Sequence, residues 1–409
     1  MNKKKILNDP IYGFITIPGD LIFDVIEHPY FQRLRRIKQL GLADYTYPGA
    51  LHTRFHHALG AMHLMGLALT NIQAKGHLIS KEEFEAAQLG VLLHDIGHGP
   101  YSHALENTLL KNISHESLSL LIIEALNDQM GNALSLTLSI FNNSYPRKFF
   151  HQLISSQLDI DRMDYLQRDS FFTGVSEGTI GADRIIKMLE VVNDEVVIEE
   201  KGIYSIENFL NARRLMYWQV YLHKKVLGAE KMIIKIIERA RFLITSGERL
   251  EATPALIHFL TREINNNDFK NNGESLQFFT MLDDYDIWGA IKHWAYHKDY
   301  ILSLLSKNIL NRKLFKVEIN PEPVSEDKFN KISKALLSQY KINSSEISYL
   351  LVKGKISNEA YQAGGHKINI LMKGGELLDI AQASDLPNIK ALSHIVEKHY
   401  LCWPKDLIL

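Results

Sequence analysis

The sequence predicts a mainly α-helical protein with a small C-terminal α+β lobe, and two observations carry this prediction. Through the first two-thirds of the chain, apolar residues recur at the three- and four-residue spacing of helices, as between Met62 and Leu69. From Leu314 the pattern changes to the two-residue alternation that is typical of half-buried strands. We therefore expect a helical domain over residues 1–270 and an α+β lobe over residues 271–409.

Composition and charge are those of an ordinary globular protein. Of 409 residues, 46% are hydrophobic and 23% are charged, and the formal net charge is -1. Nothing in this balance indicates a nucleic-acid partner or a membrane surface. The single cysteine, Cys402, excludes an internal disulfide and a cysteine-based metal site. Because the sequence has no apolar signal region and no apolar run of membrane-spanning length, we expect a cytoplasmic protein without a membrane partner.

The N-terminal segment is expected to form a hairpin and two helices. Turn residues at 8–13 precede a short strand at 14–17, and a helix begins near Asp20. A second helix is expected from Pro29 to Leu40, because apolar residues recur there at helical spacing. We interpret the basic run on its opposite face as solvent-exposed, with an anion-binding site as the alternative. This basic run consists of Arg33, Arg35, Arg36 and Lys38.

The remaining elements are predicted from caps, breakers and periodicity. Helices are expected from Thr53 past Leu69 and over 81–94, 114–126, 152–169, 213–226, 326–340 and 388–400. Strands are expected near 315–319, 349–353 and 368–372. In the helix over 152–169, Asp161, Arg168 and either Asp164 or Tyr165 share a face. For this segment alone, a salt-bridged surface helix is an equally good interpretation.

The stretch from Gly90 to His103 is the strongest functional signal in the chain. An apolar run ends in the adjacent residues His94 and Asp95, and His98 and His103 follow among two glycines and a proline. These breakers let side chains converge, and imidazole nitrogen and carboxylate oxygen both suit a divalent transition metal. An isolated His–Asp pair would be better interpreted as polar residues at a helix end. Further ligand candidates elsewhere in the chain favour a metal site instead.

Residues from three helices complete the metal set, which comprises His57, His94, Asp95 and Asp161. His57 is expected to point inward, with Arg54 one turn earlier on the same face, where its guanidinium could bind phosphate. Two imidazoles and two carboxylates leave two positions open on a six-coordinate ion. This favours manganese, iron, nickel or cobalt over a closed structural zinc site. Open positions would admit a water molecule and a phosphoryl oxygen.

The order His, His-Asp, Asp resembles the HD superfamily of metal-dependent phosphohydrolases. The resemblance extends to the deoxynucleoside triphosphate triphosphohydrolases, which include dGTPases and the vertebrate SAM-and-HD-domain enzymes, and it is strong up to about residue 230. It is carried by the motifs Asn8–Ile11, Phe31–Arg35, Ile37–Gly41, Pro48–Ala50, Arg54–His57, His94–His103 and Asp159–Tyr165. It implies an HD-domain helical core and a divalent transition metal, zinc included, with magnesium accompanying the nucleotide.

The resemblance also implies roles for individual residues. The metal ligands would be the four residues named above. The matching active-site residues are His98, His103, Glu106 and His115. Residues that match phosphate contacts are Arg54, Arg162 and Tyr165. Residues that match contacts to the sugar or base are Gln39, Leu40, Asp169, Arg213 and Tyr221. Residues that match a second, regulatory nucleotide site are Asn8, Glu27, Gln32 and Arg35.

Three positions depart from the family pattern. His56 replaces an acidic residue beside a ligand, and Glu106 is longer by one methylene than the aspartate of relatives. Leu222 stands where relatives carry a glutamine that reads the sugar or base, so the base preference stays open. At the regulatory positions, a capping asparagine and a surface Glu–Arg pair are an equally good interpretation.

We therefore expect a phosphohydrolase that cleaves deoxynucleoside triphosphates to deoxynucleoside and triphosphate. One alternative is an HD phosphohydrolase acting on a nucleoside monophosphate or another phosphoester. Another is a nucleotide- or nucleic-acid-binding module with a relic site, which the complete ligand set disfavours. The resemblance further implies a nucleotide substrate and a homo-oligomer, either a dimer or a tetramer.

Overall fold

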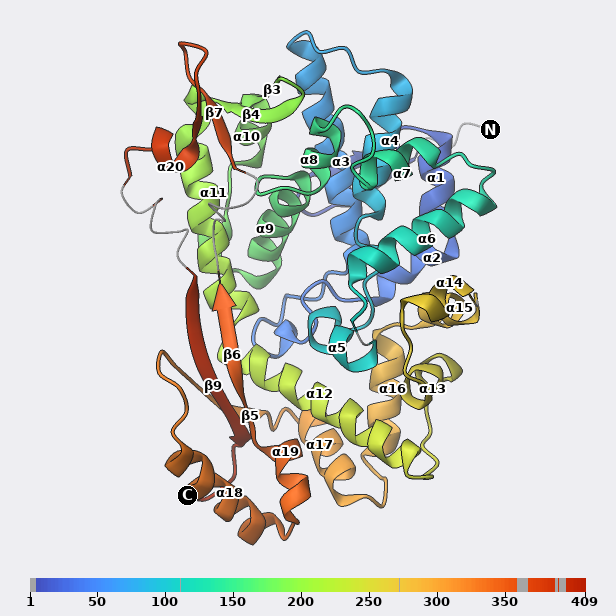
Figure 1. The fold of residues 1–409 in the computed structure, drawn as a ribbon, viewed down its shortest axis with the longest axis vertical. Helices are drawn as coiled ribbons and strands as arrows, with labels where there is room; N and C mark the ends of the chain where they lie inside the picture. Colours follow the sequence, from blue (N-terminus) through green and yellow to red (C-terminus); the bar gives the residue numbers. More distant parts are fainter. Residues whose placement is uncertain (1–4, 111, 272, 359–366, 387–388, 390–394) are drawn as a thin grey trace.

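The structure, a computed structural model, describes residues 5–110, 112–271, 273–358, 367–386, 389 and 395–409 (Figure 1). The side chains of His103, Asn107, Lys270 and Asn271 lie outside this description. The helices are α1 (Asp20–Glu27), α2 (Pro29–Gln32), α3 (Arg54–Ala74), α4 (Lys81–Leu93), α5 (Ser102–Leu109), α6 (His115–Gln129), α7 (Ser135–Phe141), α8 (Phe149–Ile154), α9 (Ile160–Thr173), α10 (Ala182–Met188), α11 (Ile203–Met216), α12 (Lys224–Thr245), α13 (Pro254–Thr261), α14 (Asn266–Asn271), α15 (Glu274–Met281), α16 (Asp284–Trp294), α17 (Tyr300–Leu310), α18 (Glu326–Tyr340), α19 (Ile347–Leu350) and α20 (Ile380–Ala383). The strands are β1 (Ile6–Asp9), β2 (Gly13–Thr16), β3 (Leu189–Val192), β4 (Glu195–Glu199), β5 (Phe315–Asn320), β6 (Val352–Asn358), β7 (Asn369–Leu371), β8 (Leu377–Asp379) and β9 (Val396–Pro404).

The predicted fold class is confirmed, because helices dominate and the sheets are small. Helix α3 lies between two hydrophobic cores. One core contains Phe55 and Met62 of α3, and the other contains Leu64 and Met65. Such a helix is apolar around most of its circumference, as expected for a helix that is buried on several sides. The first turns of α3 therefore place their side chains inside the molecule.

Local signals explain where the site-bearing helices begin. Ser80 and Glu83 form a capping box at α4, in which each side chain accepts a hydrogen bond from the backbone N–H of the other residue, at 2.8 and 3.1 Å. The Asp159 side chain caps α9 by accepting from the N–H of Arg162 at 2.8 Å. Gly174 ends α9 with a φ of 73°, in the left-handed region that glycine adopts readily. These caps fix the first residues of α4 and α9.

Helix α12 connects the helical body to the C-terminal lobe. It crosses the lower half of Figure 1 and packs against α5, α13, α17 and strand β5. Strands β5, β9 and β6 form an antiparallel sheet with β9 in the centre. Strand β7 pairs in parallel with β4, which brings residues 369–371 against the helical body, and β8 and β3 complete that sheet.

The predicted helix from Pro29 to Leu40 is wrong in its second half. Helix α2 is followed by a 3-10 turn, Arg33–Arg36, and the chain is extended from Ile37. Arg33, predicted to face solvent, is instead fully buried. Its guanidinium donates to the carbonyls of Leu282, Ile96 and His98 at 2.9, 2.8 and 2.9 Å. A buried guanidinium needs such acceptors, and carbonyls from two distant segments supply them.

Further element predictions are wrong in part. The helix expected over 152–169 is interrupted, because α8 ends at Ile154 and α9 begins only at Ile160, after the capping residue Asp159. The single helix expected over 213–226 is divided between three elements. Its first residues are the end of α11, a π-helical turn follows at Tyr217–Tyr221, and α12 begins after His223. The helix expected over 388–400 is contradicted from Val396 onward, where β9 begins. Residues 388 and 390–394 lie outside the described residues. The short strand expected at 349–353 begins three residues late, at Val352. Among the described residues, we find no helix with the length and apolarity needed to span a membrane.

Candidate metal centre and active site

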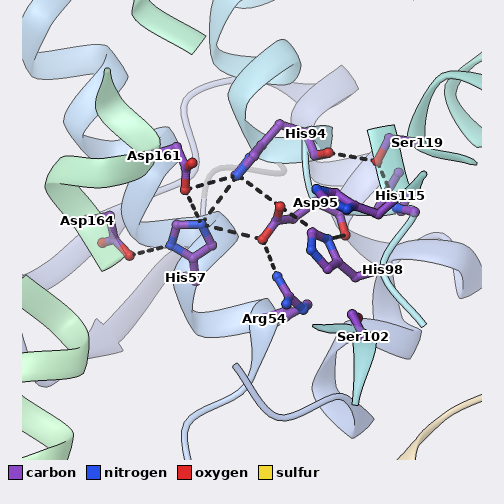
Figure 2. A network of polar contacts seen from close by, with 12 residues as sticks. Arg54, His57, His94, Asp95, His98, Ser102, His115, Ser119, Asp161 and Asp164 are labelled. Carbon is purple, nitrogen blue, oxygen red and sulfur yellow. Dashed lines mark hydrogen bonds and ion pairs between the residues drawn. The ribbon is translucent and has the colours of Figure 1, made fainter. Parts of the chain in front are cut away.

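Three ligand candidates from three helical segments meet at one point. His57 lies in the first turn of α3, His94 directly follows α4, and Asp161 lies in the first turn of α9. The Nε2 atoms of His57 and His94 are 3.4 Å apart, and Asp161 Oδ1 lies 3.1 and 3.3 Å from them (Figure 2). The separation in sequence is bridged by the packing of α3 against α4 and α9.

Asp95 borders the same point. Its Oδ1 lies 3.2 Å from His94 Nε2, and its Oδ2 lies 3.7 Å from His57 Nε2. Arg54 holds this carboxylate from the other side, with Nη1 2.6 Å from Oδ2. The four residues of the predicted metal set are therefore brought together, with Arg54 beside them.

The chemistry of these donors fits a divalent cation. His94 Nδ1 lies 2.6 Å from the carbonyl oxygen of Val91, and His57 Nδ1 lies 2.8 Å from Asp164 Oδ2. Because a carbonyl and a carboxylate only accept, each Nδ1 carries the hydrogen, and the Nε2 lone pairs face one another and two carboxylates. Acceptors gathered in this way require a shared cation or protons between them.

The electrostatics of the histidines follow from this crowding. Burial lowers the pKa of His57, but hydrogen bonds with Asp161 and Asp164 outweigh burial and raise that pKa to about 10. Burial likewise lowers the pKa of His94, and the charges of Asp95 and Asp161 raise it to about 8. Protonation would therefore neutralise the site in the absence of metal, so metal affinity should fall as the pH falls.

A histidine pair lies beside the metal set. His98 Nδ1 is 3.3 Å from Asp95 Oδ1, and its ring is tilted by 33° against that of His115, with centroids 3.9 Å apart. Glu106 accepts from the backbone N–H of His115 at 2.7 Å and lies 3.2 Å from its Nδ1. Burial lowers the pKa of His115, but Glu106 and other acids raise it above its ordinary value overall. His103 belongs to α5, but its side chain lies outside the described residues.

Glu106 and His115 also line a small pocket beside the metal set. The rest of its lining is largely apolar and includes Leu105, Phe259 and Phe279. A low local dielectric strengthens the hydrogen bond between a carboxylate and an imidazole. The apolar wall thus helps to keep the Glu106–His115 pair intact.

The residues predicted to contact the substrate form two groups. Asp169 is buried and accepts from Tyr221 Oη at 2.8 Å, while its other oxygen lies 2.7 Å from His52 Nε2. Gln39 Oε1 is buried and has no hydrogen-bond partner among the described residues, and the adjacent Leu40 is half-buried. Tyr165 lies one turn before Asp169 on α9, and its ring centroid is 6.2 Å from that of Tyr221.

The two other arginines predicted to bind substrate are held by neighbouring side chains. Arg162 pairs with Asp159, and Arg213 donates to Gln157 Oε1 at 3.2 Å. Arg213 is buried, whereas a quarter of the Arg162 side chain is exposed. Arg162 lies next to Asp161 in the first turn of α9, so it remains accessible beside the metal set.

The residues predicted for a regulatory nucleotide are mostly at the surface. Asn8 and Glu27 are exposed. Arg35 donates from Nε to Gln32 Oε1 at 2.8 Å, and its guanidinium lies 3.6 Å from the centroid of the Phe55 ring. Gln32 and Arg35 thus form one unit against the first turn of α3.

Sequence reasoning missed several residues that support the site. Ser119 Oγ donates to the carbonyl of His94 at 2.7 Å and accepts from the N–H of Gly97 at 2.9 Å. Arg33 holds the carbonyls of Ile96 and His98. These contacts fix the backbone of the loop after α4. A serine in α6 and an arginine in a basic run carry no sequence signal for such a role.

The comparisons with known proteins agree with this geometry. Residues 54–169 match the HD domain, and residues 180–249 match the HD associated region. The chain is 32% identical to the uncharacterized protein YwfO of Bacillus subtilis, over 100% of this chain and 94% of that protein. It is 30% identical to the deoxynucleoside triphosphate triphosphohydrolase SAMHD1 homolog of Dictyostelium discoideum, over 60% of this chain and 51% of that protein. The crystal structure of a phosphohydrolase from Bacteroides thetaiotaomicron superposes with a TM-score of 0.95 at 51% identity, covering 98% of this chain and 100% of that one.

Proposed function

The chain belongs to the HD-domain phosphohydrolase family, and from this premise we propose that it hydrolyses deoxynucleoside triphosphates to deoxynucleoside and triphosphate. The observation that carries the proposal is the set of four inward-facing acceptors, His57, His94, Asp95 and Asp161, with Arg54 beside them. Such a site suits a cation and a phosphate together. The Dictyostelium relative supports the choice of substrate class.

His57, His94, Asp95 and Asp161 would hold a divalent transition metal. When bound, that ion supplies Lewis-acid polarisation of a phosphoryl oxygen and lowers the pKa of a water molecule. Arg54 is fixed by Asp95, so its remaining N–H groups would orient the α-phosphate at low entropic cost. Arg162 in the first turn of α9 and Tyr165 in the second would bind the β- and γ-phosphates, with magnesium accompanying the nucleotide.

The reaction adds water across one bond. The water oxygen bonds to the α-phosphorus, the bond from phosphorus to the 5′ oxygen breaks, and the 5′ oxygen takes a proton. We assign that proton to His98, whose ring contacts that of His115, which in turn lies beside Glu106. His103 is the alternative donor that we inferred from the sequence. Of the two water protons, one stays on the triphosphate and the other is released and replaces the proton that the histidine gave to the 5′ oxygen, so the products are the deoxynucleoside and triphosphate and the protein is regenerated.

Recognition of the sugar would rest on Gln39 and Asp169. The unpartnered Oε1 of Gln39 can accept from a 3′-hydroxyl, and Asp169 is held in place by His52 and Tyr221. Tyr165 would crowd a 2′-hydroxyl. A buried polar group that is satisfied only by the correct substrate discriminates strongly against the wrong one.

The test is incubation of metal-supplemented protein with the four deoxynucleoside triphosphates, the matching ribonucleotides and a deoxynucleoside monophosphate. We expect deoxynucleoside and triphosphate, with at least about tenfold lower turnover of ribonucleotides. Asp95→Ala should abolish both bound metal and turnover, because the shell loses a charged donor. Glu199→Gln, which breaks the distant Lys75–Glu199 pair, is the matched control. Release of phosphate from the monophosphate alone, or equal turnover of ribo and deoxy substrates, would contradict the proposal.

A further inference from the structure

We propose that Asp9 and Arg168 are positioning residues for the metal centre. Asp9 orients Arg168, Arg168 orients Asp164, and Asp164 orients the ring of His57, so that the N-terminal hairpin contributes to metal affinity. The inference rests on the proposed metal centre and extends it to a segment of the chain that supplies no ligand.

A continuous series of buried contacts joins the hairpin to His57. Asp9 Oδ2 lies 2.7 Å from Arg168 Nη1. Arg168 donates to both oxygens of Asp164, from Nε to Oδ2 at 2.9 Å and from Nη2 to Oδ1 at 3.0 Å. Asp164 Oδ2 in turn accepts from His57 Nδ1 at 2.8 Å, the contact drawn in Figure 2. The side chains of His57, Asp164 and Arg168 are all fully buried.

Asp9 is fixed by the hairpin itself. Its second oxygen, Oδ1, accepts from the backbone N–H groups of Ile11 and Tyr12 at 2.9 and 3.0 Å, within the turn that joins β1 to β2. One carboxylate therefore holds the turn with one oxygen and Arg168 with the other. The Arg168 guanidinium also lies 5.5 Å from the ring centroid of Tyr12, in the same turn. A displacement of the hairpin would thus be transmitted to Arg168.

Gly60 supplies independent support for this arrangement. It lies on α3 one turn after His57, where α9 crosses. A Cβ added at Gly60 would lie 2.0 Å from Asp164 Oδ1 and 2.2 Å from Arg168 Nη2. The ion pair occupies the space that any larger residue would need. At Gly60 the contact between α3 and α9 is therefore built around Asp164 and Arg168, beside the apolar contacts that the two helices make elsewhere.

The chemistry explains why these contacts matter for a metal. Asp164 accepts the Nδ1 hydrogen of His57, which fixes the ring orientation and leaves the Nε2 lone pair for the ion. Arg168 holds Asp164 with a bidentate contact, so the carboxylate cannot rotate. Loss of such supporting partners typically lowers metal affinity by about 10- to 100-fold. If the ion-pair network were purely structural, its loss would lower the stability of the protein and leave its metal affinity unchanged.

The experiment measures cobalt or manganese affinity of the metal-stripped full-length protein by calorimetric titration. Asp9→Asn keeps the shape of the side chain and removes its charge, and we expect it to weaken metal binding by about tenfold or more. Gly60→Ala removes no charge and should weaken binding in the same direction. Asp299→Asn is the matched control, because Asp299 also binds an arginine, Arg239, and caps a backbone N–H, that of Leu302. Its elements, α12 and α17, carry no residue of the metal set.

Thermal unfolding without metal reports the structural cost of each variant. We expect Asp9→Asn and Asp299→Asn to lose comparable stability, and only Asp9→Asn and Gly60→Ala to lose metal affinity. If both keep an affinity within about twofold of wild type, the positioning role is overturned and the network is only structural. If the wild-type protein binds no metal, the proposed metal centre is wrong, and both the proposed function and the positioning role are overturned.

Discussion

Glu106 is a residue whose effect on the reaction can be separated from metal binding. It raises the pKa of His115 against the opposing effect of burial, together with the charges of Glu116 and Asp95. If protonated His115 helps to supply the leaving-group proton, activity is lost as the pH rises through this pKa. Glu106→Gln should lower the pKa and move the basic limb of the kcat profile to lower pH. The measurement is kcat against pH at saturating metal and substrate.

Glu116→Gln is the control for this prediction. Glu116 lies 3.2 Å from His115 Nε2, but about two-thirds of its side chain is exposed, so water screens its charge. Its replacement should shift the basic limb less than Glu106→Gln does. Equal shifts for the two variants, or an unmoved profile for Glu106→Gln, would mean that the hydrogen bond does not set the titration that limits kcat.

The residues of the metal set could be predicted from the sequence, whereas the residues that hold the surrounding backbone in place could not. His57, His94, Asp95 and Asp161 lie together as expected, because each residue follows or opens a helix whose boundary carries a clear cap or breaker. The role of Arg33 could not be predicted in the same way. Its partners are backbone carbonyls from distant segments, and a backbone carbonyl has no signature in the sequence.

At the scale of elements, Arg33 joins three segments that together position the histidine loop. It links the 3-10 turn after α2, the loop 96–98 and the junction of α15 with α16. Arg33→Met keeps much of the volume and leaves three buried carbonyls without this donor. We expect a loss of about 3 kcal/mol in the free energy of unfolding and a lower kcat, because the backbone of His98 is released. Denaturant unfolding and steady-state kinetics measure the two effects.

Arg36→Met tests whether this effect is specific to Arg33. Arg36 belongs to the same turn and pairs with Asp283, but 45% of its side chain is exposed. Its loss should cost about 1 kcal/mol or less. If Arg33→Met proves no more harmful than Arg36→Met, the buried hydrogen bonds to the loop have no special role in positioning it.

The element predictions failed where distant pairing decided the structure. Residues 396–404 form the central strand of a sheet, paired with β5 and β6 on its two sides. The consecutive residues Leu401, Cys402 and Trp403 are all buried, so the alternation that would mark a half-buried strand is absent there. The helix Glu326–Tyr340 was predicted correctly, because its amphipathic pattern is local and its cap, Ser325, precedes it directly.

At the scale of the whole molecule, the predicted helical domain and the predicted C-terminal lobe share one sheet. The division between residues 270 and 271 stays a prediction. Strand β7, which lies beyond that boundary, pairs with β4 of the helical body, and α12 packs against elements on both sides. Local sequence patterns could not predict this shared sheet, because parallel pairing between distant strands leaves no trace in local periodicity.

The last prediction concerns assembly and regulation, and it also belongs to the whole molecule. Arg35 lies against Phe55, two residues before His57, and Asn8 directly precedes Asp9. A nucleotide that contacts both would therefore act on two segments that support the metal centre. We expect an oligomer in light scattering, and we expect a deoxyguanosine nucleotide to raise turnover of a second deoxynucleotide through a coupling free energy between the sites.

Glu27→Ala provides the test of this coupling, because Glu27 is exposed and lies outside the metal and substrate sets. It should remove the activation and leave the rate without added nucleotide unchanged. A ligand shifts an equilibrium only as far as its affinities for the two states differ, so activation requires a nucleotide contact that changes with the state of the hairpin or of α3. A hyperbolic rate curve that neither the second nucleotide nor Glu27→Ala alters would leave Asn8, Glu27, Gln32 and Arg35 with structural roles alone.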